Sequence, residues 1–101
     1  MKLDEIRKLV SLEAGVDITL KTQKRQVVYA RAIYFKLCRQ FTMQPLSAIG
    51  KEVGRDHATV LHGINIFNDV ISECEMEYNK IYERVKSVVI SSDANKEKYF
   101  E

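Results

Sequence analysis

Residues 54–62 read Gly54-Arg55-Asp56-His57-Ala58-Thr59-Val60-Leu61-His62, and this stretch decides how the chain folds. Five polar side chains occupy the eight positions after the glycine. Apolar residues then recur at helical spacing from Val60 onward. Glycine permits a tight turn, and aspartate is a favoured residue at a helix N-cap. We therefore expect a turn at Gly54 and a helix that begins at about Asp56 with a polar first turn.

A short helix is predicted immediately before this turn. Pro45 suits the first turn of a helix, and Ile49 and Val53 share one face of it. We expect this face to pack on the following helix, at Val60, Leu61 and Ile64. The polar side chains of residues 55–59 are then left facing outward. A short helix, a tight glycine turn and a second helix are typical of a helix-turn-helix motif.

The rest of the chain also favours helices, because it contains four glycines and one proline in 101 residues. Amphipathic spacing predicts helices over residues 3–14 and 27–41, with Gly15 capping the first. Residues 16–20 form a connector or a very short extended piece, and residues 21–26 form a polar, basic loop. The fold class is therefore all-α, a small helical domain.

Apolar residues from Val60 to Val88 are separated by alternating steps of four and three, which is a heptad pattern. One interpretation is a single long helix whose far half needs a partner. The other is two helices with a bend near Ser72 or Glu73, the second folding back on the domain. Residues 91–101 are expected to form a frayed tail.

The charge is unevenly distributed, although the formal net charge is only +2. Residues 18–51, here called the basic block, carry seven basic residues and no acidic one, whereas residues 69–101 are net acidic. A block of one sign in a protein of mixed charge favours a surface that faces a polyanion, the alternative being a solvated helix face.

Several classes of function are excluded by what the sequence lacks. Cys38 and Cys74 form no C-x-x-C pair, which argues against a disulfide framework and fits a reducing cytoplasm. No apolar run approaches the ~18 residues that a membrane span needs. Asp56 and His57 would point about 100° apart on a helix, and His57 and His62 are poorly spaced for a shared metal. No nucleotide-binding P-loop is present. We expect no catalysis, metal, cofactor, nucleotide or membrane association.

The polar residues at the start of the predicted helix have side chains suited to reading DNA in the major groove. An aspartate can accept from cytosine N4, a histidine can donate to guanine, and the methyl group of Ala58 can contact a thymine methyl. Asp56 has a second role open to it, as an N-cap that accepts from the amide of residue 58 or 59. His62 also has two roles open to it, as a DNA contact or as a partly buried side chain that packs in the turn.

The same residues carry a resemblance. Residues 55–62 resemble the motif R-D-H-[TS]-T-V-L-H of the C-terminal DNA-binding domain of the bacterial replication initiator DnaA, agreeing at seven of its eight positions. Residues 46–50 resemble the family's L-P-E-I-G, and the similar span is about residues 5–72. The resemblance implies a Trp-repressor-like fold that binds an asymmetric nonamer of double-stranded DNA as a monomer.

The resemblance also implies a role for individual residues. The base contacts would be Asp56, His57 and Ala58. The phosphate contacts would be Arg55, Thr59, His62, Arg31, Arg39 and the backbone at Leu46 and Ser47. The basic loop would place an arginine in the minor groove; here it offers Lys21, Lys24 and Arg25, and the aligned residue is Gln23.

The chain departs from the family at Ala58, where a threonine or serine is usual, and at Gly54, where the family has two glycines. The AAA+ ATPase module has no counterpart here, and the start at Met1 favours a natural small protein over an excised domain. We expect a DNA-binding domain over residues 1–72 and a helical extension with a tail over residues 73–101. The expected function is recognition of a DnaA-box-like site in replication initiation or its regulation. The alternatives are a transcription regulator, or an interaction module that forms a homodimer through the stripe of residues 64–88.

Overall fold

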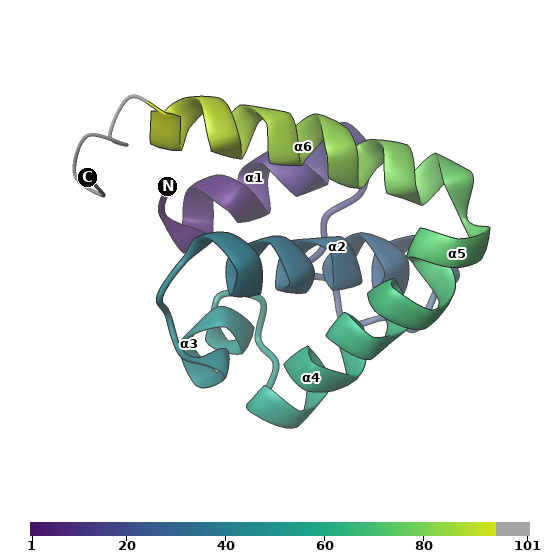
Figure 1. Cartoon of the computed structure of the whole chain (residues 1–101). Coiled ribbons are helices and arrows are strands. Elements are labelled where there is room, and N and C mark those ends of the chain that lie inside the picture. Colours follow the sequence, from purple (N-terminus) through teal and green to yellow (C-terminus); the bar gives the residue numbers. More distant parts are fainter. Residues whose placement is uncertain (95–101) are drawn as a thin grey trace.

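A computed structural model describes residues 1–94 of the chain. The helices follow one another as α1 (Leu3–Ala14), α2 (Arg25–Phe41), α3 (Leu46–Lys51), α4 (His57–Ile66), η1 (Phe67–Ile71), α5 (Ser72–Cys74) and α6 (Met76–Ala94). Residues 1–94 contain no strand. The predicted all-α class with a helix-turn-helix is confirmed. Figure 1 shows α2 in the middle, with α1 and α6 on one side and α3 and α4 on the other.

Helix α2 is the centre of the core because neighbouring helices cover it on several sides. Its consecutive residues Ile33, Tyr34 and Phe35 are all buried, although they point in different directions around the helix. The helix begins at Arg25, two residues earlier than predicted. Arg25 therefore belongs to the first turn of α2 and not to the basic loop in which the sequence placed it.

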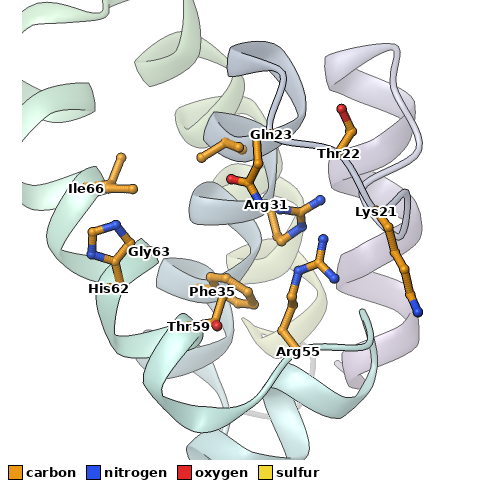
Figure 2. Close-up of a pocket in the computed structure, with 11 residues that line it drawn as sticks. Lys21, Thr22, Gln23, Arg31, Phe35, Arg55, Thr59, His62, Gly63 and Ile66 are labelled. Carbon is orange, nitrogen blue, oxygen red and sulfur yellow. The ribbon is translucent and has the colours of Figure 1, made fainter.

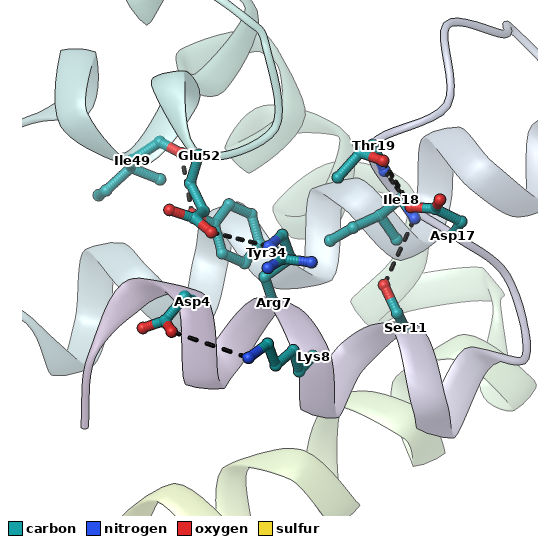
Figure 3. A network of polar contacts seen from close by, with 10 residues as sticks. All are labelled: Asp4, Arg7, Lys8, Ser11, Asp17, Ile18, Thr19, Tyr34, Ile49 and Glu52. Carbon is teal, nitrogen blue, oxygen red and sulfur yellow. Dashed lines mark hydrogen bonds and ion pairs between the residues drawn. The ribbon is translucent and has the colours of Figure 1, made fainter.

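The segment between α1 and α2 folds as turns and carries no strand. Gly15 ends α1 with a φ of 71°, as predicted for a C-cap. The Asp17 carboxylate accepts hydrogen bonds from the hydroxyl of Thr19 at 2.6 Å and from its amide at 2.9 Å (Figure 3). Ile18 is fully buried, so this connector is anchored in the core.

Polar contacts attach α3 and the residue after it to α1 and α2 (Figure 3). Arg7 of α1 donates from Nε to a carboxylate oxygen of Glu52, just after α3, at 2.8 Å. The buried hydroxyl of Tyr34 in α2 donates to the carbonyl oxygen of Ile49 in α3 at 2.9 Å. These contacts fix the first helix of the helix-turn-helix on the core.

The C-terminal heptad pattern forms two helical stretches that meet at a bend. Helix α4 continues through η1 and α5 to a break at Glu75, where φ is −110° and ψ is 77°. Helix α6 then folds back over α1 and α2 (Figure 1). Of the two interpretations of this pattern, the one with two helices and a bend is therefore correct, and the bend lies slightly later than Ser72 or Glu73.

The apolar stripe expected to form an oligomer interface packs largely within the domain. Its positions that are buried or half-buried against the chain's own core are Ile64, Phe67, Ile71, Tyr78, Ile81 and Val85. Val88 and Cys74 are exposed. The stripe is thus mostly covered by the fold itself.

Two further expectations concern the end of the chain. Residues 91–94 continue α6, so the prediction of a frayed tail is wrong for them; residues 95–101 lie outside the described part. The expected domain boundary at residue 72 falls where η1 meets α5, and Tyr82, Val85 and Val89 of α6 join the core of α2. An independent domain over residues 1–72 stays a prediction.

Candidate nucleic-acid interface

The turn between α3 and α4 is closed by backbone hydrogen bonds. The amides of Val53 and Arg55 both donate to the carbonyl oxygen of Gly50, at 3.0 and 2.9 Å. Gly54 has a φ of 71°, a conformation that favours glycine. A Cβ atom on Gly50 would lie 2.5 Å from the carbonyl oxygen of Arg55. Glycines at both positions therefore allow a single compact turn in the helix-turn-helix.

The two helices meet through the apolar residues that the sequence predicted, with one exception. Ile49, Val53 and Val60 are fully or almost fully buried. Leu61, which we expected in this contact, is 51% exposed. It lies about 100° around the helix from Val60, on a side of α4 that faces solvent.

Asp56 is the N-cap of α4, which confirms one of the two roles predicted for it. Its Oδ1 accepts a hydrogen bond from the amide of Thr59 at 2.9 Å. Hydrogen bonding from the backbone and side chain of Thr59 holds the pKa of the Asp56 carboxyl below its ordinary value. The carboxylate is therefore ionised and fixed at the start of the helix while its side chain remains exposed.

The next two residues, His57 and Ala58, are exposed in the first turn of α4. His62 is also exposed, so the alternative of a partly buried histidine is wrong. Arg55 and Thr59 are half-buried. The first turns of α4 thus present a solvent-exposed surface, and the half-buried polar side chains of Arg55 and Thr59 lie next to it.

Beside this surface lies a pocket of about 520 Å³ between α4, α2 and the basic loop (Figure 2). Among the described residues, the charged side chains that line it are the cations Lys21, Arg31 and Arg55. The rest of the lining comprises Thr22, Gln23, Val28, Phe35, Thr59, His62, Gly63 and Ile66. A pocket with cations and hydroxyl groups but no carboxylate in its lining is suited to an anion.

Arg31 forms part of the pocket wall and is only 3% exposed. Its Nε donates to the carbonyl oxygen of Ile18 at 3.0 Å, and its Nη2 to that of Leu20 at 2.7 Å. Burial, and then the positive charge of Arg55, lower the pKa of the Arg31 guanidinium. Arg31 thus holds the connector before α2 in place. The sequence predicts Arg31 only as a phosphate contact and does not predict this structural role.

The other predicted residues are distributed around the helix-turn-helix. Lys21, Arg31, Arg55, Thr59 and His62 meet at the pocket. Outside the pocket lie Arg39, exposed in the last turn of α2, Leu46 and Ser47, which open α3, and Lys24, the N-cap of α2.

Arg25 also lies outside the pocket and forms an ion pair with Glu75. Sequence reasoning missed Glu75, since no local signal connects residues 50 positions apart. It also missed Phe35 and Ile66, whose apolar character predicts burial and not a pocket wall.

Two kinds of feature are missing from the described residues. No group of His, Cys, Asp or Glu within residues 1–94 is arranged to hold a metal ion. None of the helices described there is both long and apolar enough to cross a membrane.

Comparison with known proteins identifies the family. The bacterial dnaA protein helix-turn-helix family matches residues 3–66. The chain belongs to this family. The matched span includes α1 to α4 and every residue that lines the pocket, whereas Glu75 lies beyond it. The DnaA-like helix-turn-helix expected from residues 55–62 is confirmed.

Individual relatives in the DnaA family are much longer than this chain. The chromosomal replication initiator protein DnaA of Flavobacterium psychrophilum is 36% identical over 76 residues, which cover 71% of this chain and 16% of the relative. The chromosomal replication initiator protein DnaA of Streptococcus pyogenes serotype M1 is 37% identical over 91 residues, which cover 83% of this chain and 20% of the relative. The chain thus spans a fifth or less of the length of these relatives. No solved structure matches it.

Proposed function

We propose that this chain binds double-stranded DNA in a sequence-specific manner, at a DnaA-box-like site, in replication initiation or its regulation. The observation that supports this proposal is the exposed first turn of α4 beside a pocket with cationic walls. In a helix-turn-helix, the N-terminal residues of the second helix contact base edges in the major groove. The proposed role is binding without catalysis, since the family match lies on the helix-turn-helix.

Asp56, His57 and Ala58 are the proposed base-reading residues. One oxygen of Asp56 accepts from Thr59, and a carboxylate has a second oxygen that can accept from cytosine N4. The capping contact fixes the position of that second oxygen, so the two roles of Asp56 are compatible. His57 supplies a donor and Ala58 a methyl group for thymine. Because Ala58 lacks a hydroxyl, we expect a base preference that differs from that of relatives with threonine or serine at this position.

Phosphate contacts supply most of the affinity in this proposal and none of the sequence preference. Arg55, Thr59 and His62 lie beside the base-reading turn and line one side of the pocket. Lys21 lines it from the loop, and Arg31 contributes charge from the wall. A backbone phosphate of DNA at this pocket would face several donors and no carboxylate among the lining residues.

Contacts further from the pocket extend the proposed interface along the DNA backbone. The exposed Arg39 and the amides of Leu46 and Ser47 at the start of α3 are the proposed phosphate contacts on the other side of the helix-turn-helix. Lys24, next to Gln23, and Lys21, which also lines the pocket, are the proposed cations of the basic loop at the adjacent minor groove. Helix α4 would then lie between these phosphate contacts and the minor-groove cations of the basic loop.

Selection of binding sites from a pool of random duplexes tests the proposal. The chain is incubated with the pool at a fixed, stated salt concentration, and bound duplexes are sequenced over successive rounds. We expect enrichment of one motif about nine base pairs long. A pool that stays random after several rounds, or binding that does not weaken as salt is raised, would contradict sequence-specific DNA binding.

A further inference from the structure

One cation of the basic block is engaged by the acidic C-terminal part of the chain. Arg25, the first residue of α2, forms an ion pair through its Nη2 with Oε2 of Glu75. The side chain of Arg25 is 61% exposed, whereas that of Glu75 is 22% exposed. Glu75 stands at the break between α5 and α6, so the ion pair connects the start of α2 to the bend.

Aromatic contacts reinforce this connection. The guanidinium carbon of Arg25 lies 5.0 Å from the centroid of the Tyr29 ring. Tyr29 in turn meets Tyr78 of α6 edge to face, with ring centroids 5.2 Å apart and planes at 84°. A hydrogen bond to Tyr29 and then the charge of Glu75 raise the pKa of Arg25. The guanidinium is thus held from two sides, by a carboxylate and by a ring.

Two other cations of the basic block contact uncharged groups. Arg31 donates to backbone carbonyls, and Lys36 donates to the side-chain oxygen of Asn68 at 2.8 Å. Within residues 1–94, Arg25 is the only one of the seven whose charge is paired with a carboxylate. Arg25 directly follows the loop whose residues 21–23 line the proposed phosphate pocket. The paired cation therefore lies at the edge of the proposed DNA-binding surface.

We propose that Glu75 is a positioning residue that withholds Arg25 from DNA and so limits the chain's affinity for DNA. The inference rests on the proposed function. A DNA phosphate and the Glu75 carboxylate compete for the same guanidinium, and the carboxylate also repels an approaching phosphate. In the wild-type chain Arg25 remains with Glu75. Without that carboxylate Arg25 becomes an additional phosphate contact.

The test is the salt dependence of DNA binding by Glu75→Gln, measured by fluorescence anisotropy on the duplex obtained by selection. One added phosphate contact steepens the slope of log K against log salt by about 0.9. The variant should then lose about threefold more affinity than the wild type between 50 and 200 mM salt. Glu73→Gln and Glu77→Gln are matched controls, because they remove the same charge from exposed carboxylates that have no ion pair among the described residues. Both controls should keep the wild-type slope.

The double variant Arg25→Gln/Glu75→Gln has the net charge of the wild type and should return to the wild-type slope. A Glu75→Gln slope equal to that of the wild type or of the controls would overturn the inference, as would a double variant that keeps the steeper slope. Thermal melting followed by circular dichroism verifies that each variant is folded. If the wild-type chain binds no duplex at any salt, the proposed function fails and the inference with it. If the wild type binds and Glu75→Gln changes nothing, only the inference fails.

Discussion

Arg31 and Arg55 donate to the same oxygen atom, the carbonyl of Leu20, at 2.7 and 3.3 Å. Arg31 belongs to the central helix α2 and Arg55 to the turn of the helix-turn-helix, while Leu20 lies in the connector before α2. Two positive groups thus converge on one backbone carbonyl, with no carboxylate lining the adjacent pocket in the described chain. The arrangement fixes the basic loop next to α4 and leaves an electropositive pocket between them.

The first prediction concerns the stability that Arg31 provides. Arg31→Ala should lower the free energy of unfolding by about 2 kcal/mol, because it removes two hydrogen bonds to the connector, and the carbonyl oxygen of Ile18 loses its buried donor. Urea unfolding measures the effect. Arg39→Ala is the control, since Arg39 is exposed on the same helix and its loss should change stability by no more than about 0.5 kcal/mol. Equal effects of the two substitutions would show that Arg31 does not hold the connector.

A second prediction follows from the depressed pKa of Asp56. The folded chain binds fewer protons at this carboxyl than the unfolded chain, so its contribution to stability is complete above the ordinary carboxyl pKa of about 3.9 and is lost as pH falls through the lower folded value. Asp56→Asn keeps an N-cap side chain and removes the titration. Its urea midpoint should therefore decline less than that of the wild type between pH 5 and pH 2. Parallel declines would mean that the Asp56 carboxylate is not stabilised in the fold.

The tight turn predicts sensitivity at Gly50. Gly50→Ala should lower the free energy of unfolding by about 1–3 kcal/mol, because the new Cβ meets the Arg55 carbonyl oxygen, which belongs to the backbone of the turn. Lys51→Ala, at the exposed next position of α3, is the matched control. Urea unfolding of both variants tests this. A Gly50→Ala variant as stable as the control would indicate that the turn has room to expand.

The burial of the heptad stripe predicts the oligomeric state. Since Phe67, Ile71 and Val85 pack inside the domain, the chain should sediment as a monomer of 11.7 kDa. The experiment is sedimentation equilibrium with a reductant present, because Cys74 is exposed and can form an intermolecular disulfide. A mass twice as large under reducing conditions would favour the homodimer that the stripe alone suggested.

The features that the sequence predicted well depend on local signals. The bounds of α1, the turn at Gly54 and the cap at Asp56 each follow from residues within a few positions of one another. A polar first turn on α4 follows from the same short stretch. The helix-turn-helix and its exposed surface could therefore be predicted from residues 46–62.

The features that were missed depend on contacts between distant segments. The early start of α2 accompanies the pairing of Arg25 with Glu75, and the buried position of Arg31 depends on a connector that folds over it. The break at Glu75 has no glycine or proline to mark it. Charge pattern alone treats every arginine of the basic block alike, whereas the structure buries one and pairs another.

The most direct test of the central claim, that the exposed first turn of α4 reads bases, is the ratio of affinities for the selected duplex and a scrambled one at fixed salt. His57→Ala should reduce this ratio by about 5- to 150-fold, since a base contact is worth ~1–3 kcal/mol of discrimination. Arg55→Ala is the comparison, and it should weaken binding to both duplexes equally, as expected of a phosphate contact. A folded His57→Ala variant whose ratio equals that of the wild type would contradict base readout by this turn.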